Sequence, residues 1–123
     1  MKYGLAHFST NTLQAYNFAV FTVIETPFFL NKTADFLDDD TRQTFINWIA
    51  MNPLAGDVIK GTGGLRKVRW GLPGRGKSGG MRVITYCILP DGEIWLLMAY
   101  TKAKFDNLPA DFLVALKKEL FDD

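Results

Sequence analysis

The 123-residue sequence contains one cysteine, one histidine and no long apolar run. Cys87 has no partner for a disulfide within the chain, so we expect it to be a small buried apolar residue in a reducing compartment. A single cysteine and a single histidine exclude the usual zinc sites and most nucleophile–base pairs. No segment has the roughly 20 apolar residues of a membrane span, and the N-terminus is too polar for a secretory signal. These absences predict a cytoplasmic protein with no membrane segment, no metal and no other cofactor.

Acidic residues are also absent between Asp57 and Asp91. The stretch Lys60–Arg82 holds seven of the 14 basic residues, and the remaining chain, with seven bases against 13 acids, has a net charge of −6. The formal charge of +1 therefore conceals two regions of opposite sign. A phosphate-rich partner is the simplest reason for this concentration of positive charge. The alternative is a solvated loop beside lysine-protected strands.

The apolar and turn patterns predict a single α+β domain. The length suits one domain with its own core. The expected strands are residues 21–25, 65–70, 81–89 and 93–101, and the expected helices are residues 27–37, 41–51 and 110–120. The last three strands should form an antiparallel meander, and its final two, apolar on both faces, should be central in the sheet. A short helix from about Thr12 is expected in the first 20 residues.

Capping patterns predict where the helices begin. Thr26 followed by Pro27 suits an N-cap and a first helical position, and the two helices that follow should form a hairpin covering one side of the sheet. The three acids at 38–40 lie where the positive end of the second helix begins, and capping is a more ordinary role for them than binding a metal. In the final helix the expected apolar stripe consists of Phe112, Ala115, Leu116 and Leu120.

The segment Gly71–Ser78, GLPGRGKS, satisfies the P-loop pattern GxxxxGK[ST]. A P-loop must lead directly into a helix whose N-terminus faces the phosphates. Here Gly79, Gly80 and a β-rich run follow, so we do not expect a nucleoside triphosphate site. The loop is still suited to a nucleic-acid phosphate, through its amides and through Arg75 and Lys77.

Strand alternation directs the basic side chains of the meander to one sheet face. In the strand 65–70, Lys67 and Arg69 alternate with Val68 and Trp70, so these two cations point the same way. Strands that are consecutive in the chain are usually neighbours in the sheet, so polar residues on three strands can converge. The residues expected to converge are Lys67, Arg69, Arg82, Tyr100 and Lys102.

A cationic face of this kind suits cleavage of RNA. Neighbouring positive charges lower the pKa of a lysine, and a neutral lysine can accept the proton of a ribose 2′-hydroxyl. Arginine remains charged and can bind the phosphate and the negative charge that grows on it. Because no conventional acid–base pair is present, a non-catalytic module that binds RNA or a protein partner is the alternative.

The segments LAGDVIKGTGGLRKVRW, GRGKSGGMRVITY and IWLLMAYTKAK resemble the RelE superfamily of toxin–antitoxin ribonucleases, the HigB-type branch most of all. The resemblance covers about residues 21–121. It implies a metal-independent endoribonuclease that enters the ribosomal A site and cuts mRNA. It also implies a helix-turn-helix antitoxin as partner, with operator DNA contacted only through that antitoxin. Residues 1–20 precede the usual start of the family, so we expect an N-terminal extension before a toxin domain at 21–123.

The resemblance also assigns roles to residues. Lys67 and Arg69 match the paired basic positions of the family's second strand, Arg82 matches the arginine that begins the third, and Lys102 matches the lysine after the last. RelE itself has a tyrosine in its C-terminal segment, whereas no tyrosine follows Tyr100 here. The general acid therefore falls to Tyr100 or Lys102. Flanking RNA would be bound by Lys60, Arg66, Arg75, Lys77 and Lys104.

Overall fold

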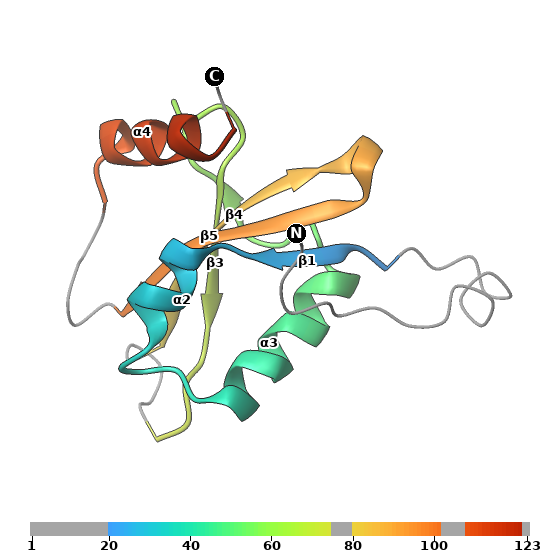
Figure 1. The fold of residues 1–123 in the computed structure, drawn as a ribbon, viewed down its shortest axis with the longest axis vertical. Helices are drawn as coiled ribbons and strands as arrows, with labels where there is room; N and C mark the ends of the chain where they lie inside the picture. Colours follow the sequence, from blue (N-terminus) through green and yellow to red (C-terminus); the bar gives the residue numbers. More distant parts are fainter. Residues whose placement is uncertain (1–19, 75–79, 102–107, 122–123) are drawn as a thin grey trace, which may run out of the picture.

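A computed structural model describes residues 20–74, 80–101 and 108–121, and Figure 1 shows their arrangement. The strands are β1 (Thr22–Glu25), β2 (Asp57–Val58), β3 (Arg66–Trp70), β4 (Met81–Ile88) and β5 (Glu93–Thr101). The helices are α2 (Pro27–Thr33), α3 (Asp39–Met51) and α4 (Ala110–Phe121), and a 3₁₀ turn, Leu89–Asp91, joins β4 to β5. The expected short helix near Thr12 lies outside the described residues.

The five strands form one sheet in the order β1-β5-β4-β3-β2. The strands β3, β4 and β5 pair antiparallel, which confirms the meander, and β4 and β5 are central as predicted. Two features were not predicted. The strand β1 pairs with β5 in parallel, and the short strand β2 lies in a segment that was expected to be only a turn-rich link.

The sheet separates two apolar cores (Figure 1). One core lies under α3 and includes Phe45 and Ile49 of that helix, together with Val68 and Val83 of the sheet. The other lies under α4 and includes Leu113 of that helix with Ile84. The sheet is therefore the middle one of three layers. Its strands are buried on both faces, as their apolar sequences require.

The helix α2 covers the edge of β5 beyond the end of β1. Its Phe29 belongs to the α3-side core, whereas Phe28 packs against the α4-side core. Thr26 holds the start of α2 in place: its Oγ1 accepts a hydrogen bond from the Phe29 N–H at 3.1 Å and donates one to the Leu96 carbonyl at 2.9 Å. The predicted N-cap is thus present, and it is also a direct link to the central strand.

Three predicted helix features were wrong. The helix α2 ends at Thr33 rather than near Leu37, because the N–H groups of Phe36 and Leu37 both donate to the Thr33 carbonyl in a turn that brings Leu37 into the core. In α4 the residues that pack against the sheet differ in part from the expected apolar stripe. They are Leu113, Leu116, Leu120 and Phe121, while Phe112 and Ala115 are exposed. The helix α3 begins at Asp39, two residues before the expected start, and the Asp38 side chain caps it by accepting from the Thr41 N–H.

One ion pair lies beside the α3-side core. Glu25 Oε2 and Arg42 Nε are 3.0 Å apart, although the N–H is not aligned for a hydrogen bond, and Arg42 also pairs with Asp39 at 3.0 Å. Burial raises the pKa of the Glu25 carboxyl above its usual value, and the charge of Arg42 only partly opposes that effect. The pair therefore joins β1 to α3 at an electrostatic cost.

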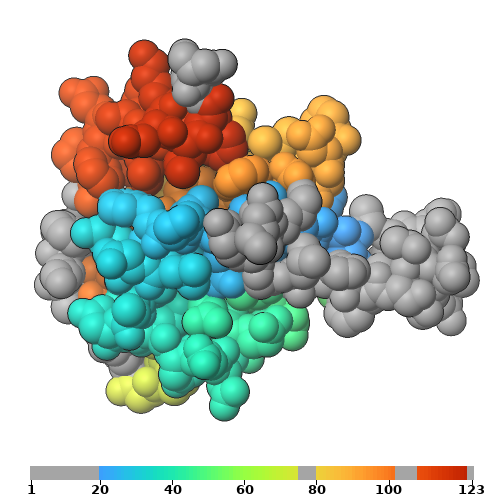
Figure 2. All heavy atoms as spheres, viewed as in Figure 1, coloured from blue at the N-terminus to red at the C-terminus, as the bar shows by residue number. Residues whose placement is uncertain are grey.

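In the space-filling view of Figure 2, α2, α3 and α4 make up most of the surface, and β5 shows only in patches between α2 and α4. None of the described helices is both long enough and apolar enough to cross a membrane. Cys87 is half-buried on β4, and this burial raises the pKa of its thiol.

Candidate nucleic-acid interface

Three of the predicted site residues form a row across the sheet. Arg69 of β3 lies directly opposite Arg82 of β4, and Arg82 lies directly opposite Tyr100 of β5. Lys67 lies one step along the same face of β3, opposite Ile84. Side chains directly opposite each other on one sheet face have Cβ atoms about 4.5–5.5 Å apart. The structure therefore brings Lys67, Arg69, Arg82 and Tyr100 together, and we call this set the cationic row.

A β-bulge is the reason that Tyr100 belongs to this row. The register between β4 and β5 shifts between Ile84 and Thr85, so that β5 holds one extra residue, Leu97. Before the bulge Leu96 faces the α3-side core, and after it Ala99 does, so Tyr100 turns to the α4 side. Strict alternation from Leu96 would have placed Tyr100 in the α3-side core. Bulges commonly redirect a side chain in this way beside functional sites.

The solvent exposure of the side chains decreases along the row from β3 through β4 to β5. Arg69 is exposed, whereas Arg82 is 9% exposed and Tyr100 only 4%. Arg82 Nη1 donates to the carbonyl oxygen of Gly80 at 3.3 Å, which orients the guanidinium. A Cβ atom at Gly80 would lie 2.4 Å from the carbonyl oxygen of Trp70, so only glycine allows the two strands to approach this closely here.

Most of the charged side chains around the row are positive, but Asp57 of β2 lies directly opposite Lys67. The strands β3 and β4 contain no acidic residue, and the only acid of β5, Glu93, lies at the opposite end of that strand from Tyr100. Burial raises the pKa of the Tyr100 phenol, and the nearby charges of Arg82 and Arg69 oppose this effect without cancelling it. At neutral pH the Tyr100 hydroxyl is therefore protonated and able to donate a hydrogen bond or a proton.

The helix α4 covers only one end of this face. Phe121 makes edge-on ring contacts with Tyr86 and Trp95, at centroid distances of 5.0 and 4.8 Å. Lys117 Nζ lies 4.7 Å from the centre of the Tyr86 ring and donates to the Gly63 carbonyl at 3.1 Å. These contacts fix the C-terminal half of α4 over the end of the sheet away from Arg82.

The other predicted binding residues are placed differently. Arg66 alternates to the face opposite Lys67, where its Nη1 donates to the carbonyls of Leu54 and Gly56 at 3.0 and 3.2 Å. Lys60 is exposed in the turn before β3, at the opposite end of that strand from Arg69. The remaining predicted residues, Arg75, Lys77, Lys102 and Lys104, lie outside the described residues.

The loop with the P-loop pattern lies only partly within the described residues. The element that follows it is the strand β4, as the sequence predicted, and not a helix. The helix N-terminus that a nucleoside triphosphate site needs is therefore missing. Among the residues that the structure describes, no group of three or more His, Cys, Asp or Glu side chains is arranged to hold a metal ion.

No protein-family model matches the chain. Among solved structures, a double arginine-to-alanine mutant of the E. coli toxin RelE in its free state is similar, with a TM-score of 0.55 and 12% sequence identity. The match covers 80% of this chain and 97% of the RelE chain. At this identity the likeness concerns the fold alone, and it confirms the predicted α+β fold of the RelE type.

Proposed function

We propose that this protein is the toxin of a toxin–antitoxin system, related to the RelE superfamily through its HigB-type branch. In this proposal it is a ribosome-dependent endoribonuclease that cuts mRNA in the A site without a metal ion and so inhibits translation in the cytoplasm. A helix-turn-helix antitoxin is its partner, and operator DNA is reached only through that antitoxin. The observation that carries the proposal is the cationic row on a RelE-type fold.

The row can supply each group that cleavage of RNA needs. The 2′-oxygen of a ribose attacks the adjacent phosphorus, the bond from phosphorus to the 5′-oxygen breaks, and the products are a 2′,3′-cyclic phosphate and a 5′-hydroxyl. Lys67 accepts the 2′-hydroxyl proton or stabilises charge, and Arg69 and Arg82 hold the phosphate oxygens. Tyr100, protonated at neutral pH, donates a proton to the departing 5′-oxygen. Lys102 is the alternative donor.

The test is expression of the wild type and of Arg82→Ala in bacterial cells, with growth measured and transcript ends mapped. We expect the wild type to arrest growth and create new ends inside translated regions. Removal of one group that stabilises the transition state should lower cleavage about 100- to 1000-fold. Lys118→Ala, which removes a positive charge from an exposed position of α4, is the matched control and should behave like the wild type. Equal growth and identical transcript ends for wild type and Arg82→Ala would contradict the catalytic assignment.

The low exposure of Arg82 and Tyr100 favours a second candidate, a module that binds RNA or a protein partner without cleaving. Under this alternative only the outer cations contact the ligand. Each phosphate contact to single-stranded RNA lowers the slope of log affinity against log salt by about 0.7. Binding to translating ribosomes with that salt dependence, and with no new transcript ends, would select this alternative.

A further inference from the structure

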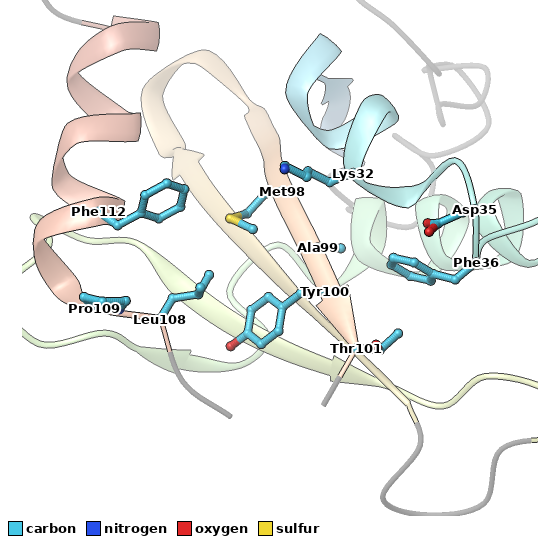
Figure 3. Close-up of a pocket in the computed structure, with 10 residues that line it drawn as sticks. All are labelled: Lys32, Asp35, Phe36, Met98, Ala99, Tyr100, Thr101, Leu108, Pro109 and Phe112. Carbon is cyan, nitrogen blue, oxygen red and sulfur yellow. The ribbon is translucent and has the colours of Figure 1, made fainter. Parts of the chain in front are cut away.

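A pocket of about 540 Å³ opens beside the cationic row, between α2, the end of β5 and the start of α4 (Figure 3). Tyr100 belongs to both: its ring lines the pocket, and its hydroxyl points away from Lys32 and Asp35. The pocket lies where β5 extends beyond its short neighbour β1, which pairs only as far as Leu96. A ligand that places a phosphate on the row can therefore extend directly into this pocket.

Apolar side chains make up part of the lining of the pocket. Met98, Leu108 and Phe112 line it, and Figure 3 shows the Phe112 ring extending from α4 toward β5, which carries the Tyr100 ring. Phe112 is 41% exposed, because it lies outside the stripe of α4 that packs against the sheet. Aromatic rings exposed next to a phosphate site are the usual platforms on which nucleic-acid bases stack.

The rim of the pocket carries one carboxylate and one ammonium group. Lys32 is in the last turn of α2, with its Nζ 5.2 Å from the centre of the Phe28 ring, and Asp35 follows three residues later. An ammonium only donates hydrogen bonds and a carboxylate only accepts them. Guanine offers both complements, since its N1–H and N2 amino group are adjacent donors and its O6 and N7 are acceptors.

We propose that this pocket binds a base next to the phosphate held by the cationic row, and that it prefers guanine. Asp35 accepts from the N1–H and N2 groups, Lys32 donates to the O6 and N7 edge, and Phe112 stacks on the ring. This inference rests on the proposed RNA substrate and adds a base preference to it.

The test uses binding rather than cleavage, so it stays informative if no cleavage is found. Four trinucleotides U-X-U, in which X is G, A, C or U and every 2′-hydroxyl is methylated, cannot be cut. Their affinities for the full-length protein are measured by NMR titration. We expect the G trinucleotide to bind about 10-fold more tightly than the other three, as one bidentate contact allows. Equal affinities for all four would overturn the proposal.

Two pairs of variants locate the preference. Asp35→Asn should abolish the roughly 10-fold preference for G, whereas Asp91→Asn, an equal charge change at an exposed site near the other end of β5, should keep it. Phe112→Ala should weaken binding of all four trinucleotides about 10-fold, whereas Leu89→Ala, another exposed apolar truncation, should not. If Phe112→Ala leaves all four affinities unchanged, the pocket does not bind a base. A protein partner is then the remaining candidate ligand for it.

Discussion

The two faces of the strands β3, β4 and β5 differ although alternate residues of the same strands form both. Toward α3 the strands present Val68, Met81, Val83 and Ala99, all at most 2% exposed. Toward α4 the neighbouring positions are the cations and the tyrosine of the cationic row. The first face has the composition of a core, whereas the second combines a smaller core, which includes Ile84 and Leu97, with the polar residues of the cationic row.

The difference follows from how each face is covered. The helix α3 contributes Phe45, Ile46, Ile49 and Ala50 to its core, all buried. The helix α4 has one fully packed residue, Leu113, and holds its position mainly through Lys117 and Phe121 at its far end. The exposed Arg69 can therefore remain on the uncovered end of the α4 face at little cost, whereas Arg82 is largely desolvated and has a hydrogen bond to the Gly80 carbonyl in partial compensation.

The largest effect on folding is expected on the α3 face. Met81 is fully buried, so Met81→Ala should lower the free energy of unfolding by about 2–5 kcal/mol, through lost apolar contact and a cavity. Arg69→Ala, at an exposed position of the α4 face, should change it by less than about 0.5 kcal/mol. Urea unfolding of both variants measures the contrast. Similar losses for the two would mean that both faces serve as core.

The second-largest effect is expected on the α4 face, where a substitution should change catalytic activity rather than stability. Tyr100→Phe removes only the hydroxyl, so cleavage of mRNA on purified ribosomes should fall about 100-fold. Tyr86→Phe, on the same face of the sheet, should not lower it. Because burial raises the Tyr100 pKa above its usual value of 10.0, ultraviolet titration should show one tyrosine that ionises late and is missing from Tyr100→Phe. A Tyr100→Phe protein of full activity would leave proton donation to another group.

The smallest effect tests Glu25, a buried charge beside the α3-side core. The folded-state pKa of Glu25 is raised above the usual value of 4.5, so the folded state favours the protonated carboxyl. Its contribution to stability is therefore present at low pH and lost as pH rises from about 4.5 through the folded-state pKa. Glu25→Gln should remove that decline, as measured by urea unfolding at a series of pH values. Wild-type and Glu25→Gln curves that stay parallel throughout this window would contradict the assignment.

The elements with strong local signals were predictable from sequence. The hairpin β4–β5, the alternation of β3 and the caps Thr26 and Asp38 all depend on residues close together in the chain. The parallel pairing of β1 and the existence of β2 depend on contacts distant in sequence, and β2 is only two residues long. Which residues of α4 face the sheet depends on the shape of the sheet beneath the helix. The spacing of apolar residues along the helix carries no information about that shape.

The sequence predicted that members of the cationic row share one sheet face, but it did not predict how they align. Lys67 and Arg69 follow from alternation, and Arg82 from its place at the start of a strand. The direct row Arg69, Arg82, Tyr100 depends on the bulge at Leu97, because strict alternation through the same residues would have turned Tyr100 to the other face. The pocket residues Lys32 and Phe112 had no sequence signal, because each belongs to a helix whose expected role was only packing.

The link between Thr26 and Leu96 spans 70 positions of the chain. During synthesis, β1 and the start of α2 emerge long before the strand that receives them, so the sheet closes only after β5 has been translated. Pairing between such distant segments is intrinsically slow. The Arg82–Tyr100 pairing is local, within the β4–β5 hairpin, but it too needs β5, so a nascent chain carries its arginines without an assembled site until that strand has been translated.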